Sequence, residues 1–98
     1  MATYYWVGGT GTWNASSTTN WALTSGGTGG VVGPPTNTDD VIIDTSSGTG
    51  TITCTSASAT CQNLTVTATQ AITLAGTLSS IYGSLSHPSS GSFVSNVI

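Results

Sequence analysis

The sequence predicts an all-β protein of 98 residues, built as a β-solenoid in which successive turns of the chain stack on one another. Short runs of β-branched residues recur at spacings of about ten residues or less. Several of these runs alternate apolar residues with Thr or Ser, which is typical of a strand with one buried face. No segment has the apolar spacing of an amphipathic helix. A β-sandwich or jelly roll is the alternative fold.

Residues 1–38 are expected to form a Trp- and Gly-rich N-terminal cap. Within them, residues 4–7 are predicted to be a short strand and residues 14–38 a mostly irregular loop. A loop of this length needs an anchor, and large aromatic side chains supply the most buried area. The segment contains all three tryptophans of the chain: Trp6, Trp13 and Trp21.

Residues 39–98 are expected to form the solenoid segment. Asn-Gly and Asp-Gly, the strongest hairpin signals, are absent, which favours the solenoid over the sandwich. The segment is long enough for only about two to three turns, and residues 92–98 are apolar, so we expect an open edge that a neighbouring subunit or further chain completes. The predicted strands are residues 41–43, 51–54, 64–67, 71–74, and a run from 77 to 85.

The composition excludes several classes of partner. The chain has no Lys or Arg, three acidic residues and one His, with a formal net charge of −3. Because it has no cationic side chain to neutralise phosphates, we expect it to bind neither nucleic acid nor an anionic membrane surface. No run approaches the roughly 20 apolar residues of a membrane-spanning helix, so no membrane insertion is expected.

The beginning of the chain bears on its location. Met1 is followed by neither basic residues nor an apolar stretch, so no export signal is visible. The Thr-, Ser- and Gly-rich composition is nevertheless of an extracellular type. A virus particle assembled inside a cell and released by lysis reconciles the two observations, as would prior removal of a signal sequence. We therefore expect a virion or extracellular location.

Two stretches of the chain resemble known proteins. They are residues 5–13 (Tyr-Trp-Val-Gly-Gly-Thr-Gly-Thr-Trp) with 20–21 and 25–27, and residues 35–44 with 51–53, 61–66, 74–78 and 82–85. Together they resemble the Trp/Gly-rich N-terminal region of β-helical structural proteins of tailed bacteriophages. They are also similar to the repeat that opens autotransporter passenger domains. The resemblance covers about residues 4–86 and implies a right-handed parallel β-helix with no catalytic signature.

The predicted function is that of a non-catalytic structural protein of a bacteriophage virion: a capsid decoration, fibre or tail appendage subunit. Such a subunit would assemble through its β edges and apolar ends into a homo-oligomer and bind other virion proteins. A secreted adhesin or autotransporter passenger fragment is one alternative. Another is a carbohydrate-binding module that holds a cell-surface glycan on exposed Trp6, Trp13 or Trp21, although these residues would equally serve as buried anchors.

Catalysis and cofactors are not expected. No Ser, Cys or Thr nucleophile has an evident base partner, because His87 is the only histidine. Asp39, Asp40 and Asp44 could bind Ca²⁺ through hard oxygen ligands. Their spacing matches no known calcium loop, and capping backbone N–H groups is the simpler role.

Cys54 and Cys61 have two alternative roles. A disulfide between them would close a loop of about eight residues after release into an oxidising medium. Otherwise both are small buried hydrophobic side chains. A zinc site would need His87 as a further ligand, and its spacing from the cysteines fits no known zinc motif.

Overall fold

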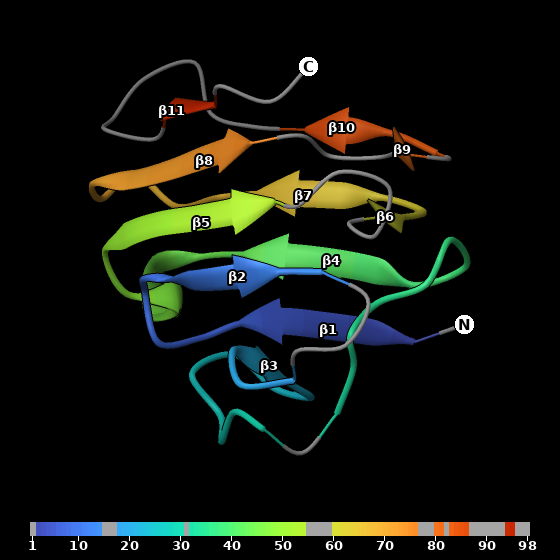
Figure 1. Ribbon diagram of the computed structural model, residues 1–98, viewed down its shortest axis with the longest axis horizontal. Helices are drawn as coiled ribbons and strands as arrows, with labels where there is room; N and C mark the ends of the chain where they lie inside the picture. The colour runs from blue at the N-terminus through green and yellow to red at the C-terminus, as the bar shows by residue number, and fades with distance from the viewer. Residues whose placement is uncertain are drawn as a thin grey trace.

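The fold is all-β, as the sequence predicts. The computed structural model describes residues 2–14, 18–30, 32–54, 60–76, 80–81, 83–86 and 94–95. These residues form eleven β-strands and one short 3-10 helix, η1 (Thr45–Ser47), with no α-helix among them (Figure 1). The strands are β1 (Thr3–Trp6), β2 (Gly11–Trp13), β3 (Trp21–Ala22), β4 (Asp40–Ile43), β5 (Gly50–Cys54), β6 (Thr60–Cys61), β7 (Leu64–Val66), β8 (Ile72–Gly76), β9 (Ser80–Ile81), β10 (Leu85–Ser86) and β11 (Val94–Ser95).

The strands form three sheets in which neighbours run mostly parallel. The first sheet has the order β10-β7-β4-β1-β3, the second has the order β11-β8-β5-β2, and the third pairs β6 with β9. Among the described strands, only β3 is antiparallel to its neighbour, β1. Parallel neighbours need a crossover connection, so the chain leaves each sheet before it returns to it.

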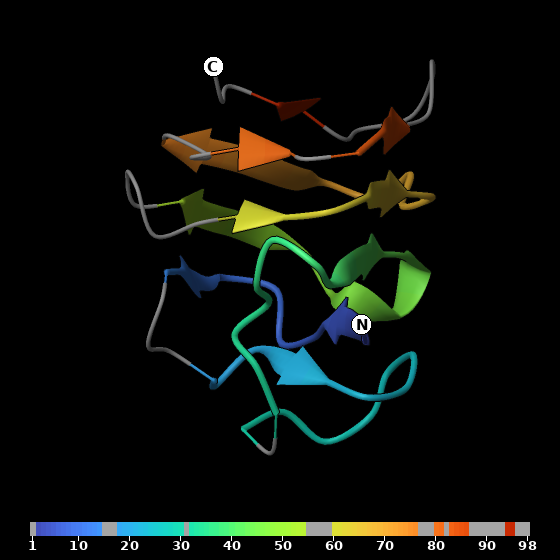
Figure 2. The same cartoon turned by 90° about the vertical axis from the view of Figure 1, so that its right-hand side faces the viewer.

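Successive strands visit the sheets in the same order, and each visit pairs with the one before. β4, β5 and β6 contribute one strand to each sheet, and β7, β8 and β9 do so again in the next layer. Asn63 is 23 residues beyond Asp40 in the layer before it, and Ser84 is 21 residues beyond Asn63. Figures 1 and 2 show the resulting stack of layers from two sides.

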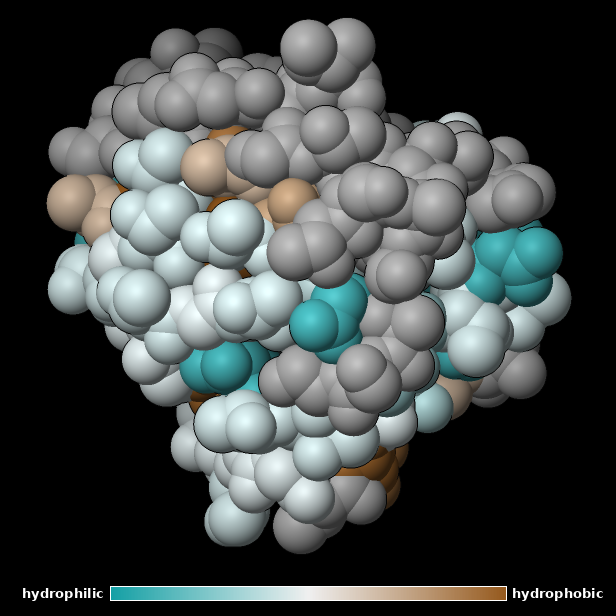
Figure 3. All heavy atoms as spheres, viewed as in Figure 1, coloured by the Kyte–Doolittle hydropathy of each residue, from teal (hydrophilic) through white to brown (hydrophobic). Residues whose placement is uncertain are grey.

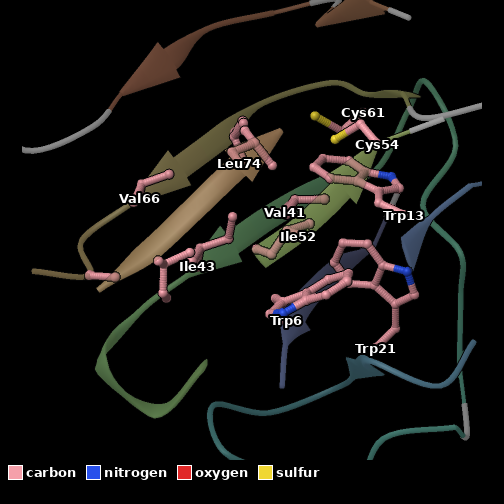
Figure 4. Close-up of a cluster of buried hydrophobic side chains, with 13 residues drawn as sticks. Trp6, Trp13, Trp21, Val41, Ile43, Ile52, Cys54, Cys61, Val66 and Leu74 are labelled. Carbon is pink, nitrogen blue, oxygen red and sulfur yellow. The ribbon is translucent and has the colours of Figure 1, made fainter. Parts of the chain in front are cut away.

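The core consists of inward-facing side chains from the sheets (Figure 4). In β4, Val41 and Ile43 are buried and the alternate residues are half-buried. β5, β7 and β8 show the same alternation. Because Val41 pairs with Leu64 and Ile43 with Val66, each buried side chain of β4 lies beside a buried one in the next layer. The register therefore keeps the same face of the first sheet apolar from β4 to β7.

Sequence patterns located the longer strands and missed the shortest ones. β3 and β6 have only two residues each, too few for an alternation to be detected, and β2, with three residues, was not predicted either. The residues expected to form a separate cap also contribute to the sheets, because β1 pairs with β4 and β2 with β5. Predicted strands match β1, β4, β5, β7 and β8, at residues 4–7, 41–43, 51–54, 64–67 and 71–74. Predictions for His87, for residues 77–79 and for most of 92–98 lie outside the described residues.

The turn between β1 and β2 lies against the turn between η1 and β5. Gly9 has a positive φ of 71°, and its N–H donates to the carbonyl oxygen of Ser47 at 2.8 Å. A Cβ atom built on Gly9 would collide with the backbone carbonyl oxygen of Thr49. This contact joins two successive layers through backbone atoms alone, so it leaves no room for a side chain.

We therefore expect Gly9→Ala to destabilise the fold strongly. Gly30 is a matched control, because its φ is also positive, 87°, and a Cβ there would meet nothing within 4 Å. Left-handed strain should lower the free energy of unfolding of Gly30→Ala by about 1–2 kcal/mol. Gly9→Ala adds a backbone collision and should lose about 2–5 kcal/mol. Urea denaturation of both variants measures the difference, and equal losses would contradict the proposed contact between layers.

Candidate functional site

The three tryptophans meet at the N-terminal end of the core. Trp6 comes from β1, Trp13 from β2 and Trp21 from β3, and all three are fully buried. The ring centroids of Trp6 and Trp21 are 5.0 Å apart and those of Trp13 and Trp21 are 5.2 Å apart, both with edge-to-face geometry (Figure 4). Such pairs add to the large apolar area that each indole buries. The cluster therefore supplies most of the buried side-chain volume of the first layer.

This placement leaves no indole face for a ligand. Stacking of a sugar ring requires an exposed aromatic face, and each of these three side chains has 0% exposure. Tyr4 is partly buried and tilted against Trp21, with ring centroids 6.5 Å apart. The predicted aromatic residues are thus brought together as a packing unit.

The indole N–H groups are not equivalent. Trp6 Nε1 donates a buried hydrogen bond to the carbonyl oxygen of Gly9 at 2.7 Å. The Nε1 groups of Trp13 and Trp21 are buried, and they have no hydrogen-bond partner among the described residues. Trp6 therefore fixes the β1–β2 turn in addition to filling volume, whereas Trp13 and Trp21 act through packing.

Trp6→Phe should consequently cost more stability than Trp13→Phe. Both substitutions remove a similar volume from the same cluster, but only the first leaves the buried carbonyl of Gly9 without its donor. The expected difference in free energy of unfolding is about 1 kcal/mol. Paired denaturant titrations measure it. A Trp13→Phe variant that loses as much as Trp6→Phe would show that the hydrogen bond contributes nothing.

Asn20 holds the loop that leads to Trp21. The side-chain Nδ2 of Asn20 donates to the backbone carbonyl oxygen of Val7 at 2.6 Å, and the backbone carbonyl oxygen of Asn20 accepts from Val7 N at 2.8 Å. Asn20 is buried, with 7% exposure. Sequence analysis did not single out this role, because an Asn in a loop carries no local signal of the backbone it will meet.

The three aspartates have separate hydrogen-bond partners. Asp39 accepts hydrogen bonds from Ala2 N and from both the backbone N–H and the hydroxyl of Thr36, each at 2.9 Å. Burial opposes ionisation of Asp39, but the hydrogen bonds from Thr36 and Ala2 outweigh it and hold the pKa below its usual value. Asp40 accepts instead from Asn63 Nδ2, at 2.9 Å.

Asp44 caps the 3-10 helix. Its Oδ1 accepts from Ser46 N at 3.0 Å, and Ser47 Oγ accepts from Asp44 N at 2.9 Å, so the two residues form a capping box. Its Oδ2 accepts from Ser25 Oγ at 2.6 Å, which ties the distant loop to η1. Within the described part of the chain, no three His, Cys, Asp or Glu residues are grouped as metal ligands would be.

Cys54 and Cys61 both lie in the core as free thiols. Cys54 ends β5 and Cys61 ends β6, and both sulfur atoms point into the same part of the core, beyond Trp13 (Figure 4). Burial raises the pKa of each thiol to about 12, assisted by the charge of Cys61 on Cys54 and of Asp40 on Cys61. A disulfide between them stays a prediction for the chain in an oxidising medium.

The raised thiol pKa values predict a loss of stability at alkaline pH. The unfolded thiols release their protons from about pH 9, whereas the folded thiols keep them to about pH 12. The stabilisation is therefore complete below pH 9 and falls as the pH rises through this window, by at most about 1.4 kcal/mol per thiol and pH unit. Denaturant titrations of the reduced chain and of Cys54→Ala/Cys61→Ala measure it.

In that comparison the double variant is the control, because it differs from the reduced chain only in lacking the two thiols. The stability difference between the reduced chain and the double variant should shrink as the pH rises above 9. A constant difference would show that the thiols ionise as easily in the folded chain as in the unfolded one.

The two ends of the stack differ. Among the described strands, β10 pairs only with β7 and β11 only with β8, so the last layer has one free side. At the other end, β3 and the loop that follows it, residues 23–30, lie beyond β1 (Figures 1 and 2). An edge strand presents unpaired N–H and C=O groups to any further strand. The free side of β10 and β11, called the open edge below, is therefore the candidate functional site.

Comparison of the chain with protein-family models, with curated proteins and with solved structures finds no match. In the part of the chain that the structure describes, no helix is long and apolar enough to cross a membrane.

On the face shown in Figure 3 the described residues are weakly polar: residues of intermediate hydropathy, drawn near white, predominate among those that are coloured. This agrees with a chain in which charged residues make up 3%.

Proposed function

We propose that this chain is a non-catalytic structural module of a bacteriophage virion, a parallel β-solenoid that assembles through its open edge. The observation that carries the proposal is the difference between the two ends of the stack. The last described layer offers two edge strands to a further chain, whereas β3 and the Trp cluster lie at the first layer.

The strand order supports the solenoid over the sandwich. Sandwiches are made largely of antiparallel strands joined by hairpins and Greek-key connections. Here β1, β4, β7 and β10 follow one another in parallel, and β2, β5, β8 and β11 do the same. Buried residues pair with their equivalents 22 or 23 positions along the chain, as Ile52 does with Leu74 and Val41 with Leu64, and this period is within the range of repeat architectures. Parallel crossovers are nearly always right-handed, which favours the right-handed form.

The virion assignment rests on the sequence resemblance and on the role of its residues in the structure. The Trp/Gly motif of residues 5–13 provides Trp6, Trp13 and the tight turn at Gly9. These residues lie at the first layer of a stack of parallel strands, which supports the β-helix that we propose from the resemblance. A secreted adhesin would use the same start, so location distinguishes the two. Glycan binding on tryptophan is not supported, because the three indoles are buried.

Assembly through the open edge can be tested with charged edge strands. Lysine on an edge strand opposes further strand pairing. Ser86 of β10 is exposed and pairs with Thr65 of β7, and Val94 of β11 pairs with Thr73 of β8; Thr65 and Thr73 are half-buried. We expect the unmodified chain to form dimers through its open edge at low micromolar concentration, and Ser86→Lys/Val94→Lys to remain a monomer. Light scattering measures the mass.

The matched control places the same two charges at the other end of the stack. Leu23 is 57% exposed and Thr28 is exposed, both in the segment beyond β1. Leu23→Lys/Thr28→Lys should assemble as the unmodified chain does. An unmodified chain that is folded and monomeric at every concentration would overturn the assembly proposal.

A separate experiment distinguishes a virion subunit from an adhesin. Mass spectrometry should detect the chain in purified virus particles if it is a virion subunit, and on the cell surface if it is an adhesin.

A further inference from the structure

A groove of about 300 Å³ lies on the first sheet, on the side away from the core. This volume is at the lower end of the range for small-molecule sites. Two rows of side chains cross the groove from layer to layer. One row contains Asp40, Asn63 and Ser84, and the other contains Ile42, Thr65 and Ser86. The groove is therefore built by the strand pairing itself, on rigid elements and not on loops.

The first row is held in place by its own hydrogen bonds. Asn63 Nδ2 donates to Asp40 Oδ1, and Asn63 Oδ1 accepts from Ser84 N, each at 2.9 Å. These bonds use one carboxylate oxygen of Asp40 and one of the two amide hydrogens of Asn63. The second carboxylate oxygen and the second amide hydrogen have no partner among the described residues. A fixed acceptor and a fixed donor thus lie next to each other at the groove.

The chemistry of the groove fits a neutral polyhydroxylated ligand. A carboxylate oxygen accepts from one hydroxyl group while an amide hydrogen donates to its neighbour, which is how an adjacent pair of hydroxyls is held. Ile42, half-buried in the next row, offers an apolar surface to the C–H face of a ring. An anionic ligand would meet Asp40 in a chain that has no Lys or Arg to balance the charge.

We propose that this groove binds a single ring of a neutral saccharide, with Asp40 and Asn63 as the residues that hold its hydroxyl groups. A cationic amine would satisfy Asp40 but would leave the amide hydrogen of Asn63 and the hydroxyls of Thr65 and Ser86 without acceptors or donors to match. The proposal needs no exposed tryptophan. It is also independent of assembly through the open edge, because the groove is complete within one chain.

The test is an NMR titration of the ¹⁵N-labelled whole chain with methyl glycosides of neutral hexoses and N-acetylhexosamines. At least one glycoside should produce saturable shifts in the amide signals of β4 and β7. Asp40→Asn keeps an acceptor for Asn63 but removes the charge, so it should weaken binding roughly tenfold or more. Thr65→Val removes one hydroxyl at the groove and should weaken binding roughly threefold.

Thr53→Val is the matched control, because Thr53 is exposed on the second sheet, outside the groove, and its substitution should leave binding unchanged. Glucuronic acid and methylammonium are tested beside the neutral glycosides. The proposal is overturned if no neutral glycoside gives saturable shifts in β4 and β7, if Asp40→Asn and Thr65→Val bind as the unmodified chain does, or if only methylammonium binds. Light scattering reports on assembly separately, so either proposal can fail alone.

Discussion

Parallel pairing between successive layers is the interaction on which the rest of this structure depends. The chain has no Lys or Arg, so ion pairs of these side chains play no part in its stability. Most of its surface residues are small or hydroxylated, and they bury little apolar area. The backbone ladders of β4 with β7 and of β5 with β8 place Val41 beside Leu64 and Ile52 beside Leu74. Once one layer is in place, it provides both the hydrogen-bonding edge and the apolar surface for the next.

The core side chains of the first layer have a neighbouring layer on one side only. Large buried side chains and hydrogen bonds at the turns stabilise this layer. Trp6, Trp13 and Trp21 supply volume from three short strands, while Asn20 and Gly9 fix the turns that bring these strands together. Further along, Gln70 Nε2 donates to the carbonyl oxygens of Asp44 and Gly48, at 2.9 and 3.0 Å. Hydrogen bonds from neutral side-chain amides therefore join successive layers, as ion pairs do in more highly charged proteins.

The strands of the layers could be predicted from the sequence much better than the hydrogen bonds that join the layers. Alternation in residues 41–43, 51–54, 64–67 and 71–74 located β4, β5, β7 and β8, because a buried face imposes a period of two on several residues. A strand as short as β3 or β6 cannot display a period. The anchoring role of the tryptophans could be weighed from size alone, but the partners of Asn20, Asn63 and Gln70 lie 13 to 26 residues away. Contacts at that distance depend on register, which no local pattern specifies.

The different ends of the stack also limit how copies of the chain can meet. A head-to-tail contact would place β10 of one copy against β3 of the next, but β3 has two residues and already runs antiparallel to β1. A contact between two open edges pairs β10 with β10 about a two-fold axis, and this arrangement closes after two copies. Longer assemblies then require a different chain, or further layers of the same one, at the open edge. In the proposed assembly, the Trp cluster and β3 occupy the first layer, so a further chain would add at the open edge.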